Sequence, residues 1–175
     1  MRTTPAYEIT EQNFDAIVRD HQSMVFSLAY YFLRDSSLAE ELAQEVFLNL
    51  YRCLATMESG AHMLSWLRKV TTHRAIDYAR RRQRNRRVVS LDQAPEPVSA
   101  PHSHDPMLSE SLRKLVESLP ERQRAIVILR FQEDMEPMEI AKLLDMPVNT
   151  VKSRLHRSLE FMRQKLERTG REVRS

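Results

Sequence analysis

The sequence predicts an all-α protein made of two small helical domains joined by a flexible linker. Apolar residues recur at three- and four-residue steps over much of the chain, which places them on single helical faces. Only two of the 175 residues are glycine, too few for the tight turns between the short strands of a sandwich or barrel. Residues 88–106, rich in proline, serine and histidine, interrupt this pattern and separate the domains, expected at 10–87 and 107–170.

Three helices are expected in the first domain. The first runs from Phe14 to Leu33. Ser37 and Glu40 have the spacing of a capping box, which predicts that Ser37 is the N-cap of the second helix. Its buried face is expected to hold Leu38, Leu42, Val46, Leu50 and Leu54, widened by Phe47 and Tyr51. Residues 57–63 should form a loop, and a third helix that ends in a run of arginines should follow it.

The second domain has the pattern of four helices. Asp105 and Pro106 suit the start of the first one, as N-cap and first-turn proline. The first three are expected at 108–119, 120–131 and 137–144. A fourth helix of about 20 residues would be roughly 30 Å long at ~1.5 Å per residue. Its buried face is expected to hold Val148, Val151, Leu155, Leu159, Met162 and Leu166.

Charge is unevenly distributed, although the formal net charge is only +3. Residues 35–58 are acidic and contain a single basic residue, Arg52. Residues 68–87 contain nine lysines and arginines against one acidic residue, Asp77. A polyanion such as nucleic acid is the natural partner of the basic segment, and a merely solvated basic face is the alternative.

Residues 138–155 have the pattern of a helix-turn-helix. A short helix with buried Ile140 and Leu143 would support a second helix, whose outer face is left free to enter a major groove. An ordinary helical hairpin with a charged outer face is the alternative. Hydrogen-bond donors that suit base edges and phosphates are concentrated on this free face: Asn149, Thr150, Lys152, Ser153, Arg154, His156 and Arg157.

Residues 66–82 combine an aromatic side chain, several hydrogen-bonding groups and dense arginine. This composition suits single-stranded or melting DNA, because unstacked bases need a pocket or a stacking partner and phosphates need cations. Trp66 itself is expected to lie in the core rather than against a base.

The composition also excludes several classes of function. Two glycines cannot form a glycine-rich nucleotide-binding loop, and one cysteine, Cys53, cannot form an internal disulfide or a thiolate-rich metal site. His102 and His104 offer only two ligands within the linker, a poor metal site. We therefore expect no enzymatic activity, no cofactor and no metal. Without an apolar run near ~18 residues or a secretion signal, the chain is expected to be intracellular, with no membrane insertion.

Together these segments resemble an extracytoplasmic-function (ECF, group IV) sigma factor of bacterial RNA polymerase, within the sigma-70 family. Residues 38–48 resemble region 2.2, residues 66–82 resemble regions 2.3 and 2.4, and residues 119–155 resemble region 4. The resemblance covers residues 14–168 in the order of the family. One position departs from it, since the family often has asparagine where His73 stands. That leaves open which base is preferred there in the −10 element.

The resemblance implies a protein that joins core polymerase, recognises −10 and −35 promoter elements and helps to melt the DNA. It implies that the β′ clamp helices contact an exposed helix whose polar groups are left unpaired. The contact residues would be Glu41, Gln44, Glu45 and Phe47. It also implies that the unstacked −10 strand is bound by His62, His73, Arg74, Asp77, Arg80, Arg81, Arg82 and Arg84. The helix-turn-helix donors would read the −35 element. A β-flap contact, an anti-sigma factor and a cytoplasmic location, near the membrane when that factor holds it there, follow from the same resemblance.

Two other functions fit part of the pattern. A stand-alone helix-turn-helix regulator would bind an operator as a dimer, but it has no use for the acidic helix or the linker. A helical interaction protein would carry its basic segments incidentally. Co-purification with core polymerase separates the first from a sigma factor, and a steep salt dependence of DNA binding argues against the second.

Overall fold

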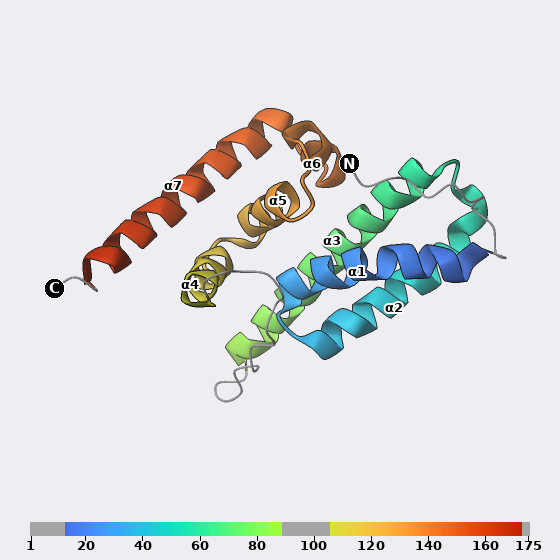
Figure 1. Cartoon of the computed structure of the whole chain (residues 1–175), viewed down its shortest axis with the longest axis horizontal. Coiled ribbons are helices and arrows are strands. Elements are labelled where there is room, and N and C mark those ends of the chain that lie inside the picture. Colours follow the sequence, from blue (N-terminus) through green and yellow to red (C-terminus); the bar gives the residue numbers. More distant parts are fainter. Residues whose placement is uncertain (1–12, 89–105, 173–175) are drawn as a thin grey trace. The chain divides into compact units, whose positions relative to one another are not determined.

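The computed structural model describes residues 13–88 and 106–172, which form seven α-helices and one short 3-10 helix (Figure 1). The chain divides into two compact units, Met1–Val98 and Ser99–Ser175. No strand occurs among the residues that the structure describes, so the all-α fold is confirmed. The predicted linker at 88–106 lies outside the described residues except for its two ends.

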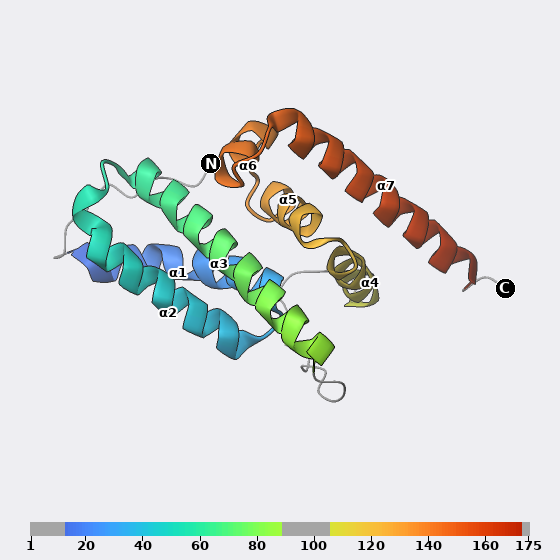
Figure 2. The same cartoon turned by 180° about the vertical axis from the view of Figure 1, so that it is seen from behind.

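The first unit contains α1 (Phe14–Leu33), α2 (Ser36–Cys53), the 3-10 helix η2 (Leu54–Thr56) and α3 (Gly60–Val88). Its three α-helices pack against one another (Figure 2). Burial of each large apolar side chain in their core stabilises the fold by about 1.5–3 kcal/mol. Side chains with no more than trace exposure come from all three helices: Ile17, Val25, Leu28, Leu42, Val46, Leu50, Met63 and Leu67.

Helix α2 begins two residues earlier than expected. Its N-cap is Asp35, whose Oδ1 accepts a hydrogen bond from the Leu38 backbone N–H at 3.2 Å. The predicted capping box at Ser37 is therefore wrong. A carboxylate is favoured at this position because it satisfies a free N–H and also interacts with the positive end of the helix dipole. The prediction that Phe47 and Tyr51 widen the buried face is half right, since Phe47 is buried but Tyr51 is 46% exposed.

The loop before α3 is shorter than the predicted 57–63, because α3 already begins at Gly60. Ser59 explains this early start: its Oγ accepts a hydrogen bond from the His62 backbone N–H at 3.1 Å, as an N-cap does. His62 in turn accepts one at Nδ1 from the Glu58 backbone N–H at 3.3 Å. His62 thus lies in the first turn of a helix rather than in a loop.

The second unit contains α4 (Pro106–Glu117), α5 (Glu121–Phe131), α6 (Pro137–Leu143) and α7 (Val148–Glu172). Helix α7 packs against each of the other three. All four were expected from the sequence, but α7 has 25 residues and is longer than predicted. The apolar side chains without measurable exposure in this unit are Ala125, Ile126, Leu129, Ile140 and Val151.

Tight turns in the described part of the chain are made without glycine. The non-glycine residues with positive φ are Arg34, Asp134 and Asp145, at 54°, 51° and 51°. Arg34 ends α1, Asp134 lies between α5 and α6, and Asp145 lies between α6 and α7. Aspartate tolerates this conformation because its short side chain can form local hydrogen bonds. A shortage of glycine therefore did not prevent left-handed turns.

Candidate nucleic-acid interface and docking groove

The helix-turn-helix is held by its buried residues and by a tight backbone connection. Ile140 of α6 and Val151 of α7 are fully buried. Between them the Met146 N–H donates to the Ala141 carbonyl at 3.0 Å, and the Thr150 N–H donates to that of Pro147 at 2.9 Å. Ala141 is also buried, as expected where two helices approach closely. The start of α7 is therefore fixed relative to α6.

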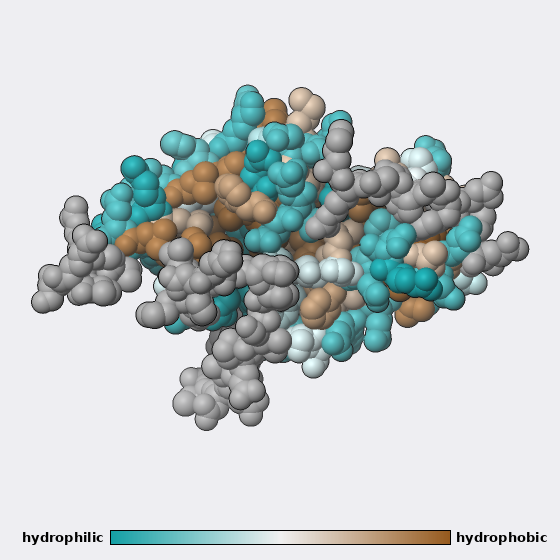
Figure 3. Space-filling view, in the orientation of Figure 1, coloured by the Kyte–Doolittle hydropathy of each residue, from teal (hydrophilic) through white to brown (hydrophobic). Residues whose placement is uncertain are grey.

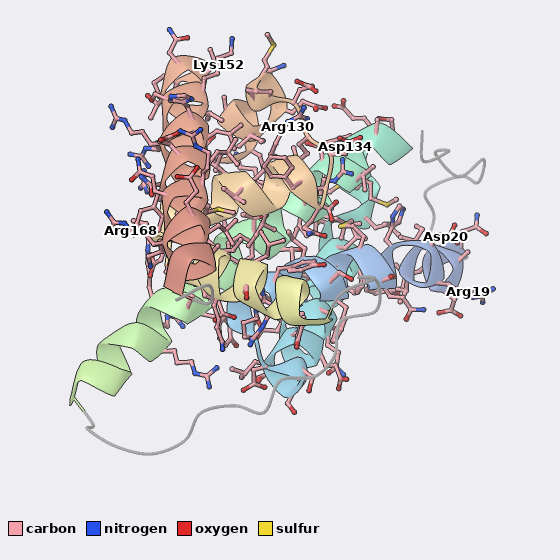
Figure 4. The ribbon with its side chains drawn as sticks, turned by 60° about the vertical axis from the view of Figure 1, so that its left-hand side comes forward. Arg19, Asp20, Arg130, Asp134, Lys152 and Arg168 are labelled. Atoms are coloured by element: carbon pink, nitrogen blue, oxygen red, sulfur yellow. The ribbon has the colours of Figure 1, made fainter. Side chains whose placement is uncertain are left out.

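The outer face of α7 presents the predicted donors. Its exposed members are Asn149, Lys152, Ser153, His156 and Arg157. Thr150 and Arg154 are half-buried, and so are Val148 and Leu155, which were expected to be buried. The Ser153 hydroxyl donates to the Thr150 carbonyl at 3.1 Å. Nitrogen-tipped side chains follow α7 from Lys152 near its start to Arg168 near its end (Figure 4).

The second half of α7 is more apolar on its surface than expected. Hydrophobic residues interrupt the hydrophilic surface along this helix (Figure 3), where Leu159 and Phe161 are 40% and 39% exposed. Leu159 was expected to be buried, and that prediction is wrong because the other helices do not cover this side of α7. The Lys165 ammonium lies 4.8 Å from the centre of the Phe161 ring. The exposed donors predicted from the sequence thus lie in the first half of the helix, whereas its second half also exposes apolar side chains.

In the first unit, the predicted −10 residues are distributed along α3. His62, Asp77 and Arg81 are exposed, whereas His73, Arg74, Arg80 and Arg82 are half-buried. Arg84 belongs to α3, but its side chain is outside the described part of the structure.

Three of these arginines, Arg74, Arg80 and Arg82, also form ion pairs within the unit. The Arg80 guanidinium lies 3.8 Å from an Asp77 carboxylate oxygen, three residues earlier on α3. The Arg82 guanidinium lies 3.6 Å from an oxygen of Asp35 and donates to the Leu33 carbonyl at 3.4 Å. Arg82 therefore ties α3 to the connection between α1 and α2.

A partly exposed ion pair links α2 to α3. Arg74 Nη1 donates to Glu45 Oε2 at 2.6 Å, and the Tyr78 hydroxyl donates to Glu45 Oε1 at 3.3 Å. Burial and the negative charges of Glu45 and Glu41 raise the pKa of Tyr78, so that its hydroxyl stays protonated as a donor. The expectation that the acidic groups of α2 are unpaired is wrong for Glu45. The sequence could not reveal this pair, which joins residues 29 positions apart.

An open groove lies between α1 and α2 and encloses about 710 Å³. Its walls are mostly apolar, and Leu48 on its α2 side is 59% exposed. Gln44 and Phe47, two predicted polymerase contacts, line it, and Phe47 is otherwise buried. The full lining is Phe14, Val18, Gln22, Ser23, Phe26, Glu40, Ala43, Gln44, Phe47 and Leu48. Sequence reasoning missed this groove, although an apolar Leu48 outside the buried stripe of its helix was a detectable sign.

Four other predictions concern Trp66, Cys53, a metal site and a membrane-spanning helix. Trp66 is half-buried and thus only partly in the core. The Cys53 thiol donates to the Asn49 carbonyl at 3.1 Å, and burial raises its pKa, which makes it a poor nucleophile. Within the described residues, no cluster of three or more His, Cys, Asp or Glu side chains could hold a metal ion. Of the helices described, none combines the length and apolarity needed to cross a bilayer.

Comparison with known families matches both units. The family model described as Sigma-70 region 2 matches residues 17–85, and that described as Sigma-70, region 4 matches residues 109–162. The chain is 31% identical over 149 residues to the RNA polymerase sigma factor SigV of Bacillus subtilis, covering 85% of this chain and 88% of SigV. It is 32% identical over 170 residues to the ECF RNA polymerase sigma factor SigE of Mycolicibacterium smegmatis, covering 92% of this chain and 64% of that relative.

Solved structures show the same fold. The sigma factor RpoE, in a co-crystal with the anti-sigma factor NepR from Bartonella quintana, matches with a TM-score of 0.70 at 20% identity, over 89% of this chain and 98% of RpoE. CnrH, in a complex with the cytosolic domain of CnrY, matches with a TM-score of 0.67 at 16% identity, over 90% of each chain.

Proposed function

The chain belongs to the extracytoplasmic-function sigma factors of the sigma-70 family, and we propose how its two helical units divide the work of transcription initiation. It is an alternative RNA polymerase sigma factor, and sigma factors are initiation factors rather than enzymes. The proposed functional domains are residues 10–87 for polymerase binding and −10 recognition, and residues 107–170 for −35 recognition. Both act in the cytoplasm.

The second unit reads the −35 element with the first half of α7. The observation that carries this proposal is the set of donors exposed directly after the tight turn that joins α6 to α7. Arginine and lysine in a major groove bind guanine edges and phosphates, and asparagine binds adenine. Lys152 and Arg157 supply the exposed charges, Asn149 an exposed amide, and half-buried Arg154 lies at the edge of the face. A β-flap contact of the same unit follows from the resemblance.

The first unit captures the −10 strand on α3. The exposed His62 and Arg81 and the half-buried His73 are available to bases and phosphates of a melted strand. Arg74, Asp77, Arg80, Arg82 and Arg84 complete the proposed surface. Because Arg80 and Arg82 are paired with carboxylates in the free protein, they would bind phosphate only with their remaining donors or after exchanging partners.

The groove between α1 and α2 is proposed to receive the β′ clamp helices. An amphipathic helix buries its apolar face in a groove of this kind. Exposed Glu40 and Glu41 lie on α2, and Glu40 lines the groove, which favours a partner with basic flanks. Gln44, Glu45 and Phe47 complete the proposed contact surface. An anti-sigma factor is a further proposed partner, because the sigma factor RpoE, which has the same fold, was solved in complex with one.

The decisive experiment separates the two units by mutation. Lys152→Ala combined with Arg157→Ala should leave binding to core polymerase unchanged but abolish run-off transcription from promoters that require a −35 element. The matched control is Arg163→Ala with Arg168→Ala, which removes the same charge from the distal half of α7. Retention of promoter-specific transcription by the first variant would contradict the proposal. Loss of polymerase binding and transcription together would show that the units are not separable.

A further inference from the structure

We propose that Glu45 restrains Arg74 in the free protein, and that docking of polymerase on α2 releases Arg74 to the −10 strand. The inference rests on the proposed function, since it assigns α2 to polymerase and Arg74 to DNA. Its structural basis is the 2.6 Å ion pair between Arg74 Nη1 and Glu45 Oε2, which connects these two surfaces directly. Glu45 therefore differs from the other acidic residues of α2, because it holds an arginine of the proposed DNA surface.

The pair weakens the affinity of α3 for DNA in two ways. A phosphate must compete with a carboxylate that already holds the guanidinium at charge-assisted hydrogen-bond distance. The negative charge of Glu45 also remains close to any phosphate that approaches Arg74. Its second oxygen accepts the Tyr78 hydroxyl at 3.3 Å, so that one carboxylate engages two side chains of the strand-binding helix.

The position of Glu45 makes it responsive to a partner on α2. It follows Gln44, which lines the apolar groove, and lies one turn after the exposed Glu41. The side chains of Glu45 and Arg74 are 36% and 39% exposed, so a cation on a docked partner can reach the carboxylate. A carboxylate drawn toward that cation loosens its hold on Arg74. By linkage, DNA bound to Arg74 must then strengthen polymerase binding by the same factor.

The first test measures binding of a fluorescent single-stranded oligonucleotide to the free full-length chain by anisotropy. Glu45→Ala should raise the affinity about two- to fivefold, the range expected when a partly exposed ion pair is removed. The slope of log affinity against log salt should steepen by about 0.7, as for one added phosphate contact on a single strand. The matched control is Glu41→Ala, which removes one negative charge from the same helix. Within the described residues, Glu41 forms no ion pair with an arginine. This control should give a smaller gain and an unchanged slope.

The second test repeats the comparison without Arg74. In an Arg74→Ala background, Glu45→Ala should give no more gain than Glu41→Ala. Equal effects of the two glutamate substitutions in the Arg74-containing chain, or a Glu45→Ala gain that persists without Arg74, would overturn the restraint. If Glu45→Ala lowers helix content by circular dichroism, Glu45→Gln keeps the side-chain length and should act in the same direction.

The third test uses holoenzyme at saturating core polymerase. There Glu45→Ala and the unsubstituted chain should bind a −10 single strand alike, because polymerase has already opened the pair. A persistent advantage of Glu45→Ala in holoenzyme would contradict the release. If Arg74→Ala changes strand binding neither in the free chain nor in holoenzyme, the proposed DNA contact of Arg74 fails instead. The two failures are therefore distinguishable.

Discussion

At the scale of single residues, His21 is a buried imidazole in the core of the first unit. It is 8% exposed, and its Nε2 has no hydrogen-bond partner. Burial lowers its pKa below the ordinary 6.5. The negative charge of Asp20 opposes this shift, and the positive charge of Arg68 adds to it. Folding therefore favours the neutral form of this imidazole over the protonated form.

The stability of the first unit should fall with acidification. Above pH 6.5, the ordinary pKa that the unfolded chain keeps, the contribution of His21 is fully present. As the pH falls below that value toward the lower pKa of the folded state, the unfolded chain gains a proton first and stability is lost. Urea denaturation followed by Trp66 fluorescence, at about pH 7.5 and about pH 5.5, should show a larger loss in the unsubstituted chain than in His21→Gln. Equal losses would exclude this residue as the cause.

Asp134 is a second residue whose conformation can be tested. Its φ is 51°, its side chain is 101% exposed, and its ion pair with Arg130 spans 3.9 Å (Figure 4). Such an exposed pair contributes little, whereas the Cβ atom makes the left-handed conformation costly. Asp134→Gly should therefore stabilise the second unit by about 0.5–1 kcal/mol.

The control is Asp134→Ala, which removes the same charge and keeps the Cβ atom. It should give no stabilisation. Hydrogen exchange of the buried amides of α5 is the suitable measurement, because the single tryptophan lies in the first unit. A gain from alanine equal to that from glycine would attribute the effect to charge rather than to backbone conformation.

At the scale of elements, α2 combines a buried stripe with an apolar groove wall. Leu42, Val46 and Leu50 face the core, while the exposed Leu48 side chain lines the groove. Gln44→Ala combined with Leu48→Ala should weaken binding to core polymerase about tenfold, since groove anchors usually dominate such interfaces. Arg52→Ala, exposed on the same helix outside the groove, is the control. Equal polymerase affinity of both variants, measured by a pull-down titration, would argue against docking in the groove.

Also at this scale, Arg82 shows that a basic helix end serves the fold as well as DNA. It connects α3 to Asp35, the N-cap of α2, and to the last residue of α1. Substitution of this arginine therefore disturbs helix packing and DNA contact together. Arg81, which is exposed, is the better position for testing phosphate contacts alone.

At the scale of the whole molecule, promoter specificity should require polymerase. Each unit offers a modest basic surface, and tethering increases the effective concentration of the second unit once the first is bound. Polymerase would set the spacing between them. In the free chain, duplex binding through two or three phosphate contacts of α7 should show a salt slope of about −2 to −3. A gel shift in which the free chain discriminates strongly for joined −10 and −35 elements would contradict this division.

The sequence by itself determined what depends on neighbouring residues along the chain. Apolar spacing predicted the helices and their main buried faces, and it also predicted which side of α7 exposes Lys152 and Arg157, because a helix repeats at a fixed angle. The N-cap of α2 was missed by two residues, because Asp35 and Ser37 are both residue types that suit an N-cap.

Only the tertiary structure decided which side chains meet across helices. The pairing of Glu45 with Arg74 depends on how α2 packs on α3, and the groove beside Leu48 depends on how α1 meets α2. Both features involve residues far apart in the chain, so no local pattern encodes them. The physical reason is that a charge or an apolar group acquires its role from the partner that packing brings within reach.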